Sequence, residues 1–232
     1  IDAMKLNPAH PALTEARTIH TKYRKRPKAD STLLKPVSSN SKLGKGKKVI
    51  SAHKWDGMPM FSLTLEERAT CPTSCHHWDD CYGNGMPFAH RFVEGKPLEN
   101  NLFRELLALN GKYPQGIVVR LHILGDFYSH KYVMFWESML QVFPNLHIFG
   151  YTAWEPHTEI GQAVGKVREY HPDRFWVRYS RPGQPNGNAI YAAHGDYDGK
   201  HFVCPEQTEK VDSCLDCGLC WTTKQTVRFL TH

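Results

Sequence analysis

The chain has 232 residues, of which 41% are hydrophobic, and its formal net charge is +6. This length suits one domain with an appendage, and it is long enough to bury a core without disulfide staples. No run of about 18 apolar residues is present and no basic-then-apolar leader opens the chain, so we expect a cytoplasmic protein that makes no contact with a membrane.

Positive charge is concentrated at the beginning of the chain. Residues 1–50 hold 12 Lys and Arg residues against 3 acidic residues, a net charge of +9, whereas the remainder carries −3. The two densest runs, residues 23–28 and 45–48, suit contact with a phosphate backbone. We therefore predict that residues 1–41 form a basic, flexible arm that binds nucleic acid. The alternative is a solvated tail without a partner.

Strand and helix patterns alternate after the arm. Residues 60–65 alternate at period two, which predicts a strand. Pro97 begins a predicted helix, and residues 117–124 form the most strand-like segment, ended by Gly125-Asp126. A second helix is expected from about His130. The two helices have apolar stripes, formed by Leu98, Leu102, Leu106 and Leu109 in the first and by Tyr132, Val133, Trp136, Met139, Leu140 and Phe143 in the second.

The same alternation continues to residue 180. Residues 146–152 predict a third strand, residues 160–170 a helix, and residues 175–180 a fourth strand. This rhythm predicts an α/β fold with parallel strands, but four strands are too few for a complete eight-stranded barrel. We expect a partial (β/α) barrel or an open, mostly parallel sheet with Cys-rich metal-binding loops.

The predicted organisation has three parts. The arm, residues 1–41, precedes a core over residues 42–203, and a Cys-rich metal-binding segment covers residues 204–232. Within the core, residues 181–203 are rich in Gly, Pro and Asn and are predicted to be a loop region.

Seven cysteines fall into two groups. The first loop carries Cys71, Cys75 and Cys81, and the C-terminal group consists of Cys204, Cys214, Cys217 and Cys220. An odd number of thiols cannot all pair within the chain, and a cytoplasmic protein keeps its thiols reduced. Clustered cysteines in such a protein indicate a metal or redox site, and inert core cysteines would not crowd into two short segments.

The cysteine spacing leaves iron–sulfur and zinc as alternatives. Four thiolates can hold a tetrahedral zinc ion. The Cys-x-x-Cys-x-x-Cys run, with Pro205 after the distant Cys204, is closer to ferredoxin-type spacing, although in reversed order. The first loop has three cysteines, and His76 or His77 is a possible fourth ligand. We favour one or two 4Fe-4S clusters and keep zinc as the alternative.

Five ordered motifs resemble the phage "gene product eighty-eight" family. They span about residues 42–232 and consist of Lys42-Leu43-Gly44-Lys45-Gly46, Cys71-Pro72 with Cys81-Tyr82, Gly125-Asp126-Phe127-Tyr128-Ser129, Cys204-Pro205-Glu206-Gln207, and Cys214-x-x-Cys217-Gly218-x-Cys220-Trp221. The resemblance implies a fold group and no established activity.

A looser resemblance is to radical S-adenosylmethionine enzymes, which carry a three-Cys loop after the first strand of a partial barrel. It implies that Cys71, Cys75 and Cys81 ligate a 4Fe-4S cluster with one open iron, and that Gly125 and Asp126 hold the methionine part of S-adenosylmethionine. Tyr128 or Tyr151 would face the pocket. The departure is the spacing, three then five residues here instead of three then two. The C-terminal group would match an auxiliary cluster.

Several candidate residues also have structural interpretations. Asp126 is equally suited to cap a helix, and Tyr128 and Tyr151 are typical core or rim aromatics. His122 and His147 lie within predicted strands, where histidines are usually structural. Three functions therefore stay open: a radical enzyme acting on nucleic acid or protein, a non-catalytic iron–sulfur protein with a nucleic-acid-binding arm, and a zinc-stabilised interaction protein.

Overall fold

A five-stranded sheet organises the protein. The computed structural model describes residues 32–86, 89–196 and 198–230, with positions 11 and 13 and the backbone of residues 23–24. In spatial order the strands are β2 (Lys35–Pro36), β3 (Met60–Ser62), β5 (Ile117–Leu121), β6 (Leu146–Thr152) and β7 (Phe175–Tyr179). All neighbours are parallel except β2, which runs antiparallel to β3. The prediction of an open, mostly parallel sheet is confirmed, and β2 is an edge strand that the pattern did not reveal.

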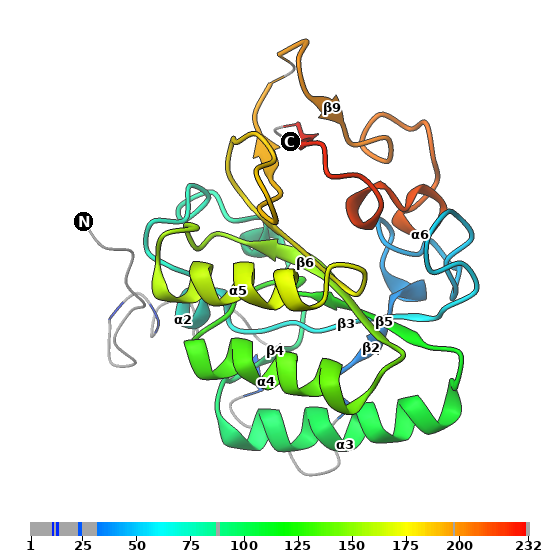
Figure 1. The fold of residues 1–232 in the computed structure, drawn as a ribbon. Helices are drawn as coiled ribbons and strands as arrows, with labels where there is room; N and C mark the ends of the chain where they lie inside the picture. Colours follow the sequence, from blue (N-terminus) through cyan, green and yellow to red (C-terminus); the bar gives the residue numbers. More distant parts are fainter. Residues whose placement is uncertain are drawn as a thin grey trace.

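Three long helices cover one face of this sheet. They are α3 (Lys96–Lys112), α4 (His130–Val142) and α5 (Glu159–Tyr170), and Figure 1 shows them side by side. The shorter helical turns are α2 (Glu67–Thr70), α6 (Cys214–Cys217), and the 3-10 turns η1 (Val37–Ser39), η2 (Tyr82–Gly85) and η3 (Leu219–Trp221). Among the described residues, every helix is too short or too polar to traverse a lipid bilayer.

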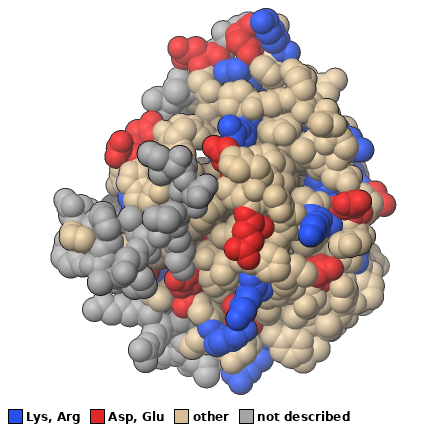
Figure 2. Space-filling view, turned by 60° about the vertical axis from the view of Figure 1, so that its left-hand side comes forward, with Lys and Arg blue, Asp and Glu red and all other residues tan. Residues whose placement is uncertain are grey.

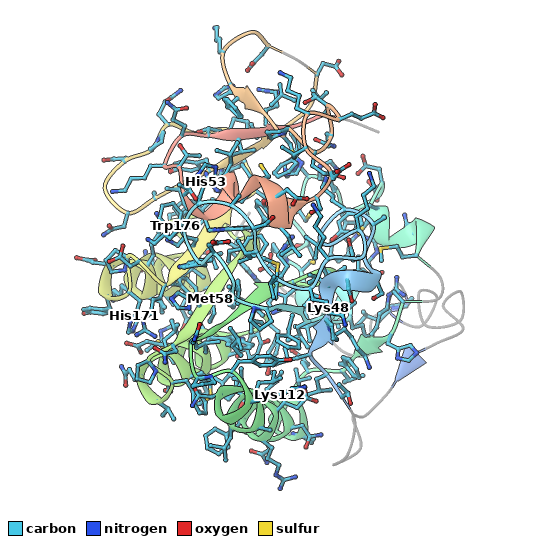
Figure 3. All side chains as sticks on the ribbon, turned by 90° about the vertical axis from the view of Figure 1, so that its right-hand side faces the viewer. Lys48, His53, Met58, Lys112, His171 and Trp176 are labelled. Carbon is cyan, nitrogen blue, oxygen red and sulfur yellow. The ribbon has the colours of Figure 1, made fainter. Side chains whose placement is uncertain are left out.

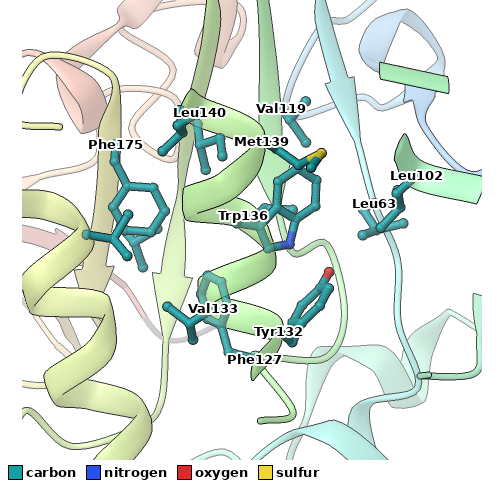
Figure 4. Packing of buried hydrophobic residues seen from close by; sticks show 14 of the residues in the cluster. Leu63, Leu102, Val119, Phe127, Tyr132, Val133, Trp136, Met139, Leu140 and Phe175 are labelled. Carbon is teal, nitrogen blue, oxygen red and sulfur yellow. The ribbon is translucent and has the colours of Figure 1, made fainter. Parts of the chain in front are cut away.

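The middle helix carries the densest part of the core. Ser129 caps α4 by accepting a hydrogen bond from the backbone of Tyr132. The predicted apolar stripe then faces the sheet, with Tyr132 and Trp136 fully buried. Figure 4 shows these side chains packed with Val119 of β5 and Phe175 of β7. This packing holds α4 against the sheet. Replacing one of these buried aromatic side chains by Ala would destabilise the fold by about 3–5 kcal/mol.

The opposite face of the sheet is covered by segments from both ends of the described chain. Val118, Phe149 and Trp176 point to this side, alternating with residues that face the helices. They pack against residues 37–58 and against Leu215 and Trp221 of the C-terminal segment. In Figure 1 these two segments, blue and red, lie together beside α6, away from the three long helices.

Two small sheets complete the fold. One joins β8 (Ala192–His194), β10 (Val227–Phe229) and β9 (Phe202–Val203), all parallel. The other pairs β1 (Tyr23–Arg24) with β4 (Arg91–Phe92). The prediction that residues 181–203 are a loop region was therefore wrong over β8 and β9. Their shared partner, β10, is distant in sequence, so a local pattern could not detect the pairing.

A close approach at the start of α5 gives a test of the packing. A Cβ atom on Gly161 would overlap the carbonyl oxygen of Glu155, whereas one on Gly111 in α3 would meet no atom within 4 Å. We expect Gly161→Ala to destabilise the fold by about 1–3 kcal/mol. Gly111→Ala should leave it unchanged or stabilise it by up to about 1 kcal/mol. Thermal unfolding of the two variants measures the difference, and equal melting temperatures would contradict this packing.

Candidate metal centre

The four thiols of the C-terminal group converge on one place. Burial raises the pKa of Cys217 to about 11, and the charges of Cys220 and Cys204 contribute to the rise. Burial also raises the pKa of Cys214 well above its usual value, with the same two neighbours contributing. Cys204 is 4% exposed and is likewise influenced by Cys220. The structure thus brings together the thiols that the sequence spacing grouped.

A buried arginine of the sheet binds the backbone of the C-terminal group. Arg178 of β7 is fully buried. Its guanidinium donates to the carbonyls of Cys220 (3.0 Å), Tyr191 (3.0 Å) and Gln225 (2.9 Å), and also to that of Thr223. Burial lowers the pKa of Arg178, while the nearby Cys220 opposes that shift. A buried cation therefore fixes the backbone around the last cysteine.

Residues 42–51 form backbone hydrogen bonds with the same C-terminal group. The backbone N–H of Cys214 donates to the carbonyl of Lys42 at 3.0 Å, and that of Leu215 to the carbonyl of Leu43 at 3.1 Å. In return, the N–H of Ser51 donates to the carbonyl of Leu215 at 3.0 Å. These bonds attach the start of α6 to residues 42–51, and the charges of Cys220 and Cys204 act on the Cys214 thiol.

The first loop is organised by a second buried arginine. Arg91 of β4 is fully buried and binds both carboxylate oxygens of Glu67 in α2, at 2.8 and 3.0 Å. The same guanidinium donates to the carbonyls of Gly83 (2.9 Å), Met86 (3.0 Å) and Ala89 (3.2 Å). Both ends of the loop are thereby attached to one side chain, as expected for a planar group with five donors.

The three thiols of the first loop also influence one another. Burial raises the pKa of Cys71 well above its usual value, and the charges of Asp126, Cys75 and Cys81 add to it. Burial raises the pKa of Cys75 to about 11. The pKa of Cys81 rises for the same reason, while Arg68 and Arg91 oppose the rise.

Asp126 attaches the first loop to the carboxyl ends of β5 and β6. Its backbone N–H donates to the hydroxyl of Thr70, and its carboxylate accepts from the Thr152 hydroxyl (2.8 Å), the Ala153 N–H (2.6 Å) and the Phe127 N–H (2.7 Å). Burial raises the pKa of Asp126 to about 7, against these donors. The helix-cap interpretation was wrong, because Ser129 caps α4.

Gly125 permits this attachment. It has a φ of +83°, and a Cβ atom there would lie 2.6 Å from both the Leu65 Cβ and the Thr70 hydroxyl oxygen. A left-handed residue without a side chain is therefore required where the segment before Cys71 crosses the end of β5.

The two candidate tyrosines, Tyr128 and Tyr151, and Tyr82 beside Cys81 lie in different surroundings. The Tyr128 hydroxyl donates to Glu99 of α3 at 2.9 Å, within the helix-side core. Tyr151 of β6 instead donates to the Cys220 sulfur at 2.8 Å, which places it beside the C-terminal group. Tyr82 is 57% exposed, yet its hydroxyl interacts electrostatically with Arg120, Cys81 and Cys71.

Arg120 links the two groups of thiols. Its guanidinium lies 4.6 Å from the ring centre of Tyr151, and its charge also acts on Tyr82 and Asp126. One terminal nitrogen, Nη1, is buried without a hydrogen-bond partner. A positive charge therefore lies between the first loop and the C-terminal group, which share this neighbour.

The two histidines that were expected within strands differ in their positions. His122 follows β5 rather than lying within it, is 3% exposed, and contacts the Tyr132 hydroxyl at 3.2 Å. His147 in β6 contacts the Asn145 carbonyl at 3.1 Å, and burial lowers its pKa to about 4. His76 and His77 of the first loop lie against His194 of β8, with ring centres 5.0 and 4.9 Å from it.

The structure describes only one of the two basic runs in full. Most of the predicted arm, including the side chains of residues 23–28, lies outside the described residues, so nucleic-acid binding stays a prediction. Of the run at 45–48, Lys45 pairs with Asp212 (3.0 Å) and Lys47 with Asp216 (2.5 Å). On the face in Figure 2, Lys and Arg side chains are scattered among acidic ones over the described surface.

A shallow hollow lies at the other end of the sheet. It is lined by Gly57, Pro59 and residues 112–116, which precede β3 and β5. Figure 3 shows this side of the molecule, with Met58 and Lys112 labelled near it. The hollow is therefore at the amino ends of the strands, opposite Asp126 and Thr152.

Comparison with known proteins identifies the family. The model of the family described as Gene product 88 matches residues 31–223. The chain belongs to the Gene product 88 family. A search of curated proteins finds no match, and neither does a search of solved structures. The matched region of this family member includes the whole five-stranded sheet and all seven cysteines.

Three arginines of this Gene product 88 protein were missed in the sequence. Each of them lies in a strand: Arg91 in β4, Arg120 in β5 and Arg178 in β7. Arg91 binds the first loop, Arg178 binds the backbone of the C-terminal group, and Arg120 lies between the two groups. The sequence contained a signal for them, namely an Arg within a segment predicted to be a buried strand. Because a buried charge needs a partner, such an Arg indicates a contact with another segment.

The role of Arg178 can be tested without any metal. Arg178→Met would leave four carbonyls without their buried donor, at a cost of about 3 kcal/mol or more. For a chain of this length that corresponds to a fall of about 6–12 °C in melting temperature. Arg104→Met, on the exposed surface of α3, is the control. Hydrogen exchange should accelerate over residues 214–229 in the first variant only. Unchanged exchange there would contradict the role.

Proposed function

We propose that this protein is an iron–sulfur protein whose C-terminal group binds a 4Fe-4S cluster. The observation that carries the proposal is the convergence of four thiols above a buried arginine, with the Tyr151 hydroxyl on one sulfur at 2.8 Å. Thiolate-rich ligation selects iron–sulfur clusters or zinc. When bound, the cluster would supply one-electron redox chemistry or a rigid link between segments.

The separation of the thiols supports a cluster over a single zinc ion. All seven cysteines are among the described residues, and no three of their sulfurs lie within 4.8 Å of one another. Four thiolates on one zinc ion at about 2.3 Å would be about 3.8 Å apart. In a cubane each thiolate binds a different iron, so the sulfurs are farther apart. The Cys-x-x-Cys-x-x-Cys spacing supports the same choice.

Charge balance supports an anionic centre here. A cubane with four thiolates is an anion, and buried charge requires a partner. Arg178 lies beneath Cys220, and the charge of Lys42 acts on both Cys204 and Cys214. The Tyr151 hydroxyl donates to Cys220, and hydrogen bonds to ligand sulfurs raise the reduction potential of such clusters.

The first loop supports a second cluster with an incomplete ligand set. Cys71, Cys75 and Cys81 are mutually close enough to shift one another's pKa, and they supply three thiolates. The fourth iron would then accept a small molecule, for which S-adenosylmethionine is the candidate. Asp126 is buried and already accepts three hydrogen bonds, so it supports the loop and is poorly placed to give its whole carboxylate to a methionine ammonium group.

Metal analysis of the anaerobically purified protein tests the proposal. We expect a brown protein with iron and sulfide in about equal amounts. Cys217→Ser should remove the iron of the C-terminal centre and Cys75→Ser that of the first loop, each lowering iron by about half. Lys224→Ala, at an exposed position of the same C-terminal segment, is the control and should keep the full content.

The outcomes separate the alternatives. A colourless protein with stoichiometric zinc and no iron would overturn the proposal. With dithionite as the reductant and S-adenosylmethionine as the probe, formation of 5′-deoxyadenosine that is lost in Cys75→Ser would assign the first loop as an open centre. If the reduced, iron-loaded protein leaves the probe intact, the first loop does not act in this way.

A further inference from the structure

Three histidines from two distant segments meet beside the first loop. His76 and His77 lie in the loop, and His194 ends β8. One imidazole nitrogen of each lies within 4.8 Å of the other two. In the part of the chain that the structure describes, this is the only set of three potential metal-ligating residues with such short separations.

Each of two imidazoles has a nitrogen available for a ligand. The Nε2 atom of His194 is buried and has no hydrogen-bond partner. The ring of His194 is fixed by stacking on Phe229 of β10, with ring centres 5.5 Å apart. His77 contacts both carboxylate oxygens of Asp80 through Nδ1, at 3.2 and 3.4 Å, which leaves Nε2 for a metal.

The contact between His77 and Asp80 is the arrangement that metal-binding histidines usually show. A carboxylate on one ring nitrogen fixes the tautomer and orients the other nitrogen toward the ion. Asp80 also provides negative charge near His76, against the positive charge of Arg181.

We propose that His76, His77 and His194 form a mononuclear site for a divalent transition-metal ion, with zinc as the expected occupant. Three imidazoles at about 2.0–2.1 Å from zinc would place their nitrogens about 3.4 Å apart. The separations in the structure require inward shifts of about an ångström or less to reach this value. Three protein ligands leave a fourth position open, and His76 is exposed to solvent.

This site is distinct from the thiol centres. Its three ligands are nitrogens, which suit zinc, copper, nickel or cobalt, whereas the proposed clusters need thiolates. The ion would also connect the first loop to β8, two segments that are more than 100 residues apart in the sequence. Binding would therefore restrain the loop that carries Cys71, Cys75 and Cys81.

Cobalt titration of the full chain tests the site. Co²⁺ is added to the protein after chelator treatment, with the iron content measured before and after. In the difference spectrum against the cobalt-free protein, we expect one equivalent that gives weak visible bands without the intense near-ultraviolet absorption of cobalt–thiolate bonds. His194→Ala and His77→Gln should each weaken binding by at least about 100-fold, and Asp80→Asn by about 10-fold. His157→Ala, an exposed histidine, should have no effect.

Iron content and folding separate this inference from the proposed function. Before cobalt is added, the histidine variants should have the same iron content and the same thermal unfolding as the wild-type protein. Retained cobalt affinity in both His194→Ala and His77→Gln would overturn the site. So would a thiolate-type spectrum that disappears in Cys75→Ser, because the ion would then be bound by the cysteines.

Discussion

The fold depends on the burial of Arg178 beneath the C-terminal segment. A guanidinium that is buried on the face of the sheet opposite the three long helices needs hydrogen-bond partners, because removing an ion from water costs several kcal/mol. Here four backbone carbonyls replace that water, and all of them belong to residues 191–225. The sheet therefore needs the C-terminal segment to satisfy its charge, and the segment needs the sheet to bring its four cysteines together.

The first loop repeats this arrangement with a different strand. Arg91 satisfies its charge with Glu67 and three loop carbonyls, so the loop is shaped by a cation that it surrounds. Arg120 lies between the two assemblies and touches aromatic rings instead of carbonyls. The two groups of thiols thus differ in their surroundings. One is attached to β7, and the other is attached through Thr70 and Asp126 to the end of β5.

Local periodicity was sufficient for the central α/β unit. The predicted strand at 146–152 matches β6, and the stripe from Tyr132 to Leu140 faces the core because apolar spacing alone decides which side of a helix is buried. The pairing of β8 with β10 and the meeting of His76 with His194 could not be predicted in this way. Both depend on segments far apart in the chain, and neither segment carries a strong local pattern. The grouping of the cysteines was readable from spacing, whereas the arginines that position them became visible only with the sheet register.

The bonds between Cys214 and Lys42, and between Leu215 and Leu43, have a consequence for the order of assembly. They join positions more than 170 residues apart, so this part of the molecule has high contact order and forms slowly compared with the local helices. During synthesis, Cys217 and Cys220 are among the last described residues to leave the ribosome, long after β5, β6 and their helices can pair. The three thiols of the first loop are available much earlier. The two groups of cysteines in one chain therefore become available at different times, and the later group arrives together with carbonyls to which Arg178 of the sheet donates.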